Sequence, residues 1–257
     1  MMQEAIAAAI AAIEARHEVR VLYAAESGSR AWGFASPDSD YDVRFIYAHR
    51  RDWYLSIGEP RGVIEAMLPG DLDLAGWDLR KALRLYQGGN YALNEWLDSP
   101  IVYREHGSLA RQLRALLSQA FRAPGGHHHY LRTARNVYDS HLLGEAVRIK
   151  KVFYVLRPLL ACRWIRHTGT QPPTAFRPLT QARFVTDDER DMVHALERMK
   201  AVAMEGERVV LAPALRAWID GELAAAEAAA STLRSSANLR TDTLDRVLIE
   251  CLAEAWG

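Results

Sequence analysis

The sequence of 257 residues has little cysteine, no long apolar run and no net charge. Its two cysteines, Cys162 and Cys251, lie far apart and outside any CxxC pattern, which excludes a disulfide framework and predicts a cytoplasmic protein. The longest apolar stretch, Ala5–Ile13, is shorter than the roughly 20 residues that span a bilayer and has no basic leader. We therefore expect neither a membrane segment nor a signal peptide.

The zero net charge, from 32 Lys and Arg against 32 Asp and Glu, conceals an uneven distribution. Between His106 and Arg183 there are 13 basic residues and only two acids, Asp139 and Glu145, so this stretch carries +11 and the remainder −11. Basic surfaces commonly bind phosphates. A set of solvated helix faces explains the same pattern about equally well.

The first part of the chain combines helix and strand patterns. Apolar residues recur at helical spacing at the N-terminus, alternating or continuous apolar runs indicate strands, and a Pro-Gly-Asp turn predicts a hairpin. Asp78 is a candidate N-cap. The expected helices are 3–16, 79–86 and 92–97, and the expected strands are 19–25, 41–48, 62–68 and 72–77.

After about residue 105 the strand patterns give way to helical ones. The expected helices are 109–121, 127–143, 146–167, 187–204, 211–229 and 243–256. Pro158 should kink or interrupt the third of these. The fold class is therefore α+β, with a mixed domain over residues 1–105 followed by an all-α domain with a basic face over residues 106–257.

One constellation points to phosphate chemistry. Gly28-Ser29 follows an expected strand, and after ten intervening residues Asp40 and Asp42 open the next strand. Carboxylates at i and i+2 on a strand point to the same face, where their charges repel unless a cation neutralises them. Mg²⁺ suits this place because it binds through one or two carboxylates together with substrate phosphates. The turn offers backbone N–H groups and a hydroxyl to a phosphate.

The run GSRAWGFASPDSDYD resembles the signature of nucleotidyltransferases of the DNA polymerase β superfamily. That signature has a third carboxylate on a later neighbouring strand. Asp73, in LDLAGW, is the best match here, and Asp71 and Glu65 are weaker alternatives.

Further blocks resemble a bacterial family associated with RNA-repair genes, the RNA repair pathway polymerase β family. These blocks are DSDYDVRFIY, GWDLRKALRL, NEWLDSPIVY, KKVFYVLRPLLACRWI and PPTAF, and the resemblance covers most of residues 21–178. It implies a nucleotidyltransferase-fold mixed β-sheet with flanking helices, followed by the all-α domain. It implies the reaction class more firmly than the substrate.

The resemblance implies two-metal transfer of a nucleoside monophosphate from an NTP to a hydroxyl acceptor, with release of pyrophosphate. Asp40 and Asp42 would bind Mg²⁺ that orients the triphosphate, and with Asp73 a second Mg²⁺. The expected NTP is ATP. The basic half of the chain and the association of the family with RNA repair favour an RNA or tRNA end as acceptor, and a protein hydroxyl or a small molecule stays equally open. Nothing in the sequence indicates the oligomeric state.

Candidate nucleotide-binding residues extend beyond the turn of Gly28 and Ser29. Arg30 directly follows that turn, and a second group lies in the basic half, where spacing at i, i+4 and i+7 places three side chains on one helical face. That group consists of Lys150, Tyr154 and Arg157, with Lys151 on its edge. A solvated or salt-bridged face is the structural alternative.

Two other functions remain open. A catalytically inactive nucleotide- or RNA-binding module would keep the fold, and its mark would be an Asp73 that points away from Asp40 and Asp42. The chain could instead transfer the nucleotide to a protein partner, as in a toxin–antitoxin pair.

Overall fold

The computed structural model describes residues 2–36, 39–58, 60–202 and 206–257, without the side chains of residues 201 and 202. Over this part of the chain, no helix is long and apolar enough to cross a membrane. Both cysteines are free and buried. The residues form two compact units, one of Met1–Trp32, Asp40–Ala120 and Ala237–Gly257, and the other of Gly33–Ser39 and Phe121–Ser236.

The first unit is built on a five-stranded mixed sheet with the order β3-β4-β2-β1-β5. The strands β2 and β4 are parallel, and every other neighbouring pair is antiparallel. The strands are β1 (Arg20–Glu26), β2 (Tyr41–Ala48), β3 (Val63–Leu68), β4 (Leu72–Asp78) and β5 (Val102–Glu105). The expected hairpin and the α+β class are confirmed.

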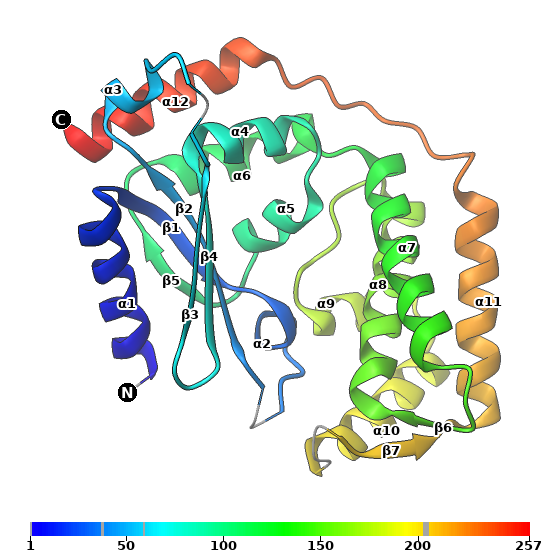
Figure 1. Cartoon of the computed structure of the whole chain (residues 1–257). Helices are drawn as coiled ribbons and strands as arrows, with labels where there is room; N and C mark the ends of the chain where they lie inside the picture. The colour runs from blue at the N-terminus through cyan, green and yellow to red at the C-terminus, as the bar shows by residue number, and fades with distance from the viewer. Residues whose placement is uncertain (1, 37–38, 59, 203–205) are drawn as a thin grey trace. The chain divides into compact units, whose positions relative to one another are not determined.

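Helices cover both faces of this sheet (Figure 1). The helix α1 (Met2–His17) packs on one face, against the side chains of Val43, Phe45 and Tyr47. On the other face, the neighbouring residues Ile46 and Ala48 belong to a core that four helices complete. These are α4 (Leu79–Gln87), α5 (Tyr91–Leu97), α6 (Leu109–Ala120) and α12 (Thr241–Trp256); the short α2 (Gly28–Trp32) and α3 (Arg51–Tyr54) lie in loops between strands.

The predicted cap of α4 is confirmed. Asp78 Oδ1 accepts hydrogen bonds from the backbone N–H groups of Arg80 at 2.9 Å and Lys81 at 3.3 Å. These N–H groups have no partner inside the helix, so the cap satisfies them. The other Asp78 oxygen, Oδ2, accepts a hydrogen bond from the Tyr54 hydroxyl at 2.6 Å, which joins α3 to the end of β4.

The division into units differs from the expected boundary near residue 105. Both α6 and α12 belong with the sheet, because Leu113, Leu244 and Val247 are buried in the same core as α4 and α5. The described residues between the glycine-serine turn and Asp40, 33–36 and 39, belong to the helical unit. There the Phe34 ring lies 5.1 Å from that of Phe153.

The second unit is mainly helical, but it contains a two-stranded sheet that the sequence patterns did not predict. The strand β6 occupies the start of the expected helix 146–167, so α8 begins at Ile149. Pro158 lies inside α8 without ending it, so of the two expected effects, a kink or an interruption, the interruption does not occur. The elements are α7 (Ala123–His141), β6 (Ala146–Arg148), α8 (Ile149–Thr168), α9 (Phe176–Thr180), α10 (Asp187–Val202), β7 (Arg208–Val210) and α11 (Pro213–Ala229).

Candidate active site

The glycine-serine turn lies directly against Asp42. The backbone N–H of Ser27 donates to the Asp42 carbonyl oxygen at 2.8 Å. Gly28 has φ +61°, and a Cβ atom built there would lie 2.4 Å from Asp42 Oδ2. A side chain at this position would be strained and would collide with the carboxylate. Glycine is therefore what allows the turn to approach the acid.

Asp42 and Asp73 lie side by side. The parallel pairing of β2 and β4 sets Asp42 opposite Asp73. A single nitrogen of Arg44, Nη2, donates to Asp42 Oδ1 at 3.0 Å and to Asp73 Oδ2 at 2.8 Å. All three side chains point to the same face of the sheet, because Asp42 and Arg44 are two residues apart on β2. The carboxylates are about one-third exposed, at 33% and 30%.

The acids proposed as alternatives to Asp73 have other surroundings. Asp71 is exposed in the hairpin turn, where its carbonyl oxygen accepts a hydrogen bond from the Tyr41 N–H at 2.8 Å. Glu65, on β3, accepts a hydrogen bond from the exposed Arg61 at 2.6 Å. Neither has a contact with Asp42 among those that the structure describes, whereas Asp73 shares Arg44 with it.

Asp40 and Arg30 form the exposed edge of the site. Asp40 immediately precedes β2, and its carbonyl oxygen accepts a hydrogen bond from Arg30 Nε at 3.0 Å. The Arg30 guanidinium lies over the Tyr41 ring, 3.7 Å from its centroid. Within the described ranges, no group of three or more acids, histidines or cysteines converges on a point where a metal could bind. The structure brings Asp42 and Asp73 together, and the metal-binding role of all three acids stays a prediction.

The donor chemistry of this pair fits Mg²⁺. Two carboxylates that face each other on neighbouring strands offer the hard oxygen ligands that Mg²⁺ prefers. Over the described part of the chain, Arg44 alone donates to these two carboxylates, which leaves Asp42 Oδ2 and Asp73 Oδ1 without a protein donor. Oxygens without protein donors are able to coordinate a cation.

Glu26 binds the backbone of Asp42 and was not predicted from the sequence as a residue of the site. Its side chain is fully buried, its Oε1 accepts the backbone N–H of Asp42 at 2.7 Å, and its Oε2 accepts the Tyr103 hydroxyl. Burial raises the pKa of Glu26, and the two hydrogen bonds oppose that rise. Glu26 is the last residue of β1, after a run of apolar residues, and its sequence neighbours give no sign of a functional role. Its contact with Asp42 arises from the pairing of β1 with β2.

Arg44 was also missed, although the sequence contained a signal for it. The rule that places Asp40 and Asp42 on one face of a strand extends to the residue two positions further on. A basic residue there lies beside the acids. The signature that the sequence resembles centres on carboxylates, whereas the observed cluster consists of two carboxylates and one guanidinium.

The four basic-half candidates lie together on α8, in the helical unit. Lys150, Lys151 and Tyr154 are half-buried, and the Lys151 ammonium lies 5.3 Å from the centroid of the Tyr154 ring. Arg157 is buried, and its Nε donates to the Thr174 carbonyl oxygen at 3.0 Å. Their role in nucleotide binding stays a prediction, with Arg157 the least accessible of the four.

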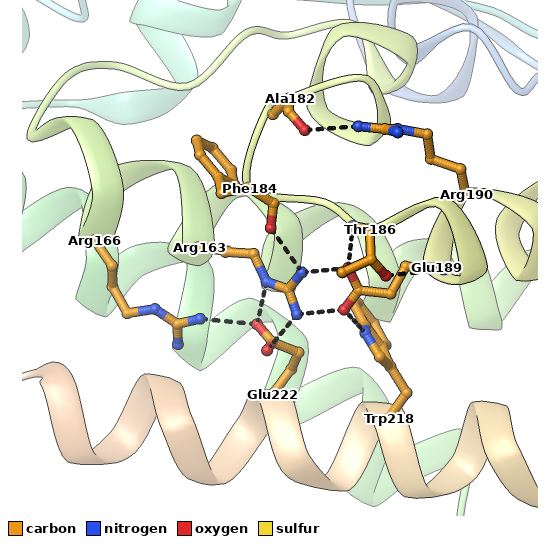
Figure 2. Close-up of polar contacts among 9 residues, drawn as sticks. All are labelled: Arg163, Arg166, Ala182, Phe184, Thr186, Glu189, Arg190, Trp218 and Glu222. Carbon is orange, nitrogen blue, oxygen red and sulfur yellow. Dashed lines mark hydrogen bonds and ion pairs between the residues drawn. The ribbon is translucent and has the colours of Figure 1, made fainter.

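A second arginine-carboxylate cluster stabilises the helical unit (Figure 2). Arg163 on α8 donates to both oxygens of Glu222 on α11, at 2.6 and 3.1 Å, and to both oxygens of Glu189 on α10, each at 2.8 Å. Arg166 also donates to Glu222, at 2.9 Å. Trp218 Nε1 donates to Glu189 at 2.6 Å. The cluster joins three helices, and its four charged side chains are at most 16% exposed.

Comparison with known proteins identifies the family. Residues 2–250 match the RNA repair pathway DNA polymerase beta family. The chain is 40% identical over 255 residues to the uncharacterized protein YcgL of Bacillus subtilis (strain 168), covering 99% of this chain and 98% of that protein. A crystal structure of a nucleotidyltransferase-like protein from Exiguobacterium sibiricum 255-15 is 15% identical, with a TM-score of 0.31, over 100% of this chain and 81% of that one. On the family match and the similarity to YcgL, the chain belongs to the RNA repair pathway DNA polymerase beta family.

Proposed function

We propose that the chain is a metal-dependent nucleotidyltransferase that transfers a nucleoside monophosphate from an NTP to a hydroxyl acceptor. The observation that supports this most strongly is the side-by-side placement of Asp42 and Asp73, with Gly28 against the free side of Asp42. A non-catalytic binding module has no need of two adjacent carboxylates with unsatisfied oxygens, because these repel the phosphates it would bind.

In the proposed reaction the acceptor oxygen attacks the α-phosphorus of the NTP, preferably ATP. The bond from that phosphorus to the oxygen bridging to the β-phosphate breaks, and pyrophosphate leaves. Mg²⁺ held by Asp42 and Asp73, with Asp40 beside them, would neutralise the triphosphate and activate the acceptor hydroxyl. Asp73 accepts the hydroxyl proton, and the backbone of the Gly28-Ser29 turn donates to the terminal phosphate. Arg30 lies next to this turn.

The acceptor that we propose is an RNA 3′ end. The family name associates the chain with RNA repair, and the excess of basic residues between His106 and Arg183 suits a polyanion. A hydroxyl on a protein partner is the second candidate.

The proposal is tested by transfer of label from α-labelled NTPs, with Mg²⁺, to RNA, to tRNA and to protein. We expect Asp42→Asn and Asp73→Asn to reduce label transfer by roughly 10³-fold, because each removes a carboxylate that would hold the Mg²⁺ needed to bind the triphosphate and to neutralise the charge of the transition state. The matched control is Asp52→Asn, which neutralises an exposed acid on α3 and should retain full transfer.

Two results would contradict the proposal. One is a wild-type chain that transfers label to none of the acceptors. The other is an Asp73→Asn variant as active as wild type. Salt-sensitive RNA binding without transfer would instead favour the inactive binding module.

A further inference from the structure

Arg44 has an unusual position for a basic residue in a site proposed to bind cations. Its Nη2 nitrogen lies between the Asp42 and Asp73 carboxylates, at 3.0 and 2.8 Å. Its other terminal nitrogen, Nη1, donates to the backbone carbonyl oxygens of Val43 at 3.2 Å and Asp73 at 3.3 Å. The guanidinium therefore contacts both strands that carry the acids.

The two acids need a counter-charge whenever no metal is bound. Neighbouring strands lie about 4.8 Å apart, and Asp42 and Asp73 are directly opposite each other in the β2–β4 register. Two ionised carboxylates at this distance repel unless a cation lies nearby. Arg44 is the cation that the structure places between them, and within the described residues no other basic side chain donates to either acid.

Arg44 holds these acids loosely enough to be replaced. Only one of its nitrogens contacts the carboxylates, whereas Arg163 gives four hydrogen bonds to the two glutamates of the helical cluster. The Arg44 side chain is 19% exposed, and each acid keeps one oxygen without a protein donor. A divalent cation can therefore take over the carboxylates while Nη1 keeps the arginine attached to the backbone.

We infer that Arg44 is a positioning residue that serves as the built-in counter-ion of Asp42 and Asp73, and that it competes with the divalent cation for them. This inference rests on the proposed function for the identity of the competing ion. The counter-ion role itself does not depend on that function. Loss of Arg44 leaves the acids close together and unneutralised, so the metal-free protein loses stability and gains more from a metal than wild type does.

The first experiment measures melting temperatures of the whole chain in EDTA by circular dichroism. Arg44→Met should lower Tm by roughly 3 °C, the size expected for a partly exposed ion cluster in a chain of this length. The same change in the Asp42→Asn/Asp73→Asn background should lower Tm by less than about 1 °C, because no repulsion remains there. Equal losses in both backgrounds would overturn the counter-ion role.

The second experiment repeats the melts with 10 mM Mg²⁺. The rise in Tm on adding Mg²⁺ should be larger in Arg44→Met than in wild type, because a ligand stabilises in proportion to the logarithm of its affinity. An equal or smaller rise in the variant would overturn the competition. A merely structural arginine would lower Tm in EDTA without changing the response to Mg²⁺.

Two variants serve as controls. Arg44→Lys keeps a positive charge between the acids and should restore part of the Tm in EDTA, and this variant also serves if Arg44→Met does not fold. Arg61→Met removes an exposed arginine paired with Glu65 on the same sheet and should change Tm by less than about 1 °C with or without Mg²⁺.

The experiments separate failure of this inference from failure of the proposed function. In one outcome, Arg44→Met lowers Tm in EDTA more in the wild-type background than in the Asp42→Asn/Asp73→Asn background, but Mg²⁺ changes Tm in no variant. This would support the counter-ion role of Arg44 and contradict metal binding by the two acids. Transfer of nucleotides together with an equal response to Mg²⁺ with and without Arg44 would support the proposed function and overturn the competition between Arg44 and the metal.

Discussion

Two clusters in this protein are built around an arginine between two carboxylates, and the helical one also contains Arg166. In each, one arginine bridges two carboxylates. Arg163 and its glutamates are 10–16% exposed, and Glu189 also accepts hydrogen bonds from Trp218 and the backbone N–H of Thr186. Asp42 and Asp73 are about one-third exposed and receive one nitrogen of Arg44 between them. Every carboxylate oxygen of the helical cluster accepts a hydrogen bond from the protein. In the sheet cluster, one oxygen of each aspartate has no protein donor among the described residues.

From this difference in exposure and hydrogen bonding we expect only the Asp42–Asp73 cluster to exchange its cation. A buried carboxylate that has all its donors loses a great deal if one of them leaves, because an uncompensated charge then remains in a medium of low dielectric constant. A carboxylate that is one-third exposed and has one donor is solvated and can change partners at little cost. The helical cluster is thus built for stability, whereas the sheet cluster is suited to binding.

The largest effect that we expect is on removal of Arg163, which tests whether the helical cluster stabilises the protein more than the sheet cluster does. Arg163→Met leaves Glu189 unpaired by any guanidinium and Glu222 with Arg166 alone. We expect a loss of about 3–5 kcal/mol in the stability of the helical unit, as for other buried ion clusters that lose one partner. Urea denaturation followed by the fluorescence of Trp218 and other tryptophans would measure it. A loss similar to that of Arg44→Met would contradict the distinction between the clusters.

Gly28→Ala tests whether the cluster of Asp42, Asp73 and Arg44 serves binding rather than stability. The new methyl group would be strained at φ +61° and would press on Asp42 Oδ2, with a strain cost of about 1–2 kcal/mol. Nucleotidyl transfer should fall far more than stability does, because Asp42 has to move. The control is Gly70→Ala, where φ is +83° but no atom lies within 4 Å of the new Cβ. Equal effects of the two substitutions on transfer would count against the placement of the turn.

The smallest effect that we expect concerns acid. Burial alone would raise the pKa of Glu189, but hydrogen bonds from Arg163, the Thr186 N–H and Trp218 outweigh it and lower the pKa to about 2. A group whose pKa is depressed by folding contributes stability above its unfolded pKa, and that contribution is lost as the pH falls toward 2. Glu189→Gln should therefore be less stable than wild type at pH 7, and the gap should narrow below about pH 4. Denaturation curves over this pH range measure the gap, and a constant gap would contradict the assignment.

The parts of the fold set by local pattern were predictable. The strand 41–48 was predicted with the bounds that β2 has, because the alternation at its start and the apolar run at its end are both local patterns of a strand. The Asp78 cap followed from residue type and position. Asp73 was named as the third acid through a family resemblance, and the structure places it opposite Asp42.

Features that depend on tertiary partners could not be predicted in this way. The apolar stripe of α12 indicates a buried face but does not say which core buries it, so the helix was assigned to the all-α half. The strands β6 and β7 have three residues each, which is too short to show the alternation of apolar and polar residues that identifies a strand in a sequence. Glu26 required the knowledge that β1 and β2 pair, since its function depends on the N–H of a residue 16 positions later.

The placement of α12 has a consequence for how the chain folds during synthesis. Its residues Leu244, Val247 and Cys251 are part of the core that Leu22 and Ile46 enter near the start of the chain. Residues 121–236 of the helical unit lie between these segments, so they leave the ribosome first and can fold before the sheet has its last covering helix. The nascent chain therefore carries an incompletely covered sheet for most of its translation, and this exposed apolar face is the state in which the protein most needs protection from aggregation.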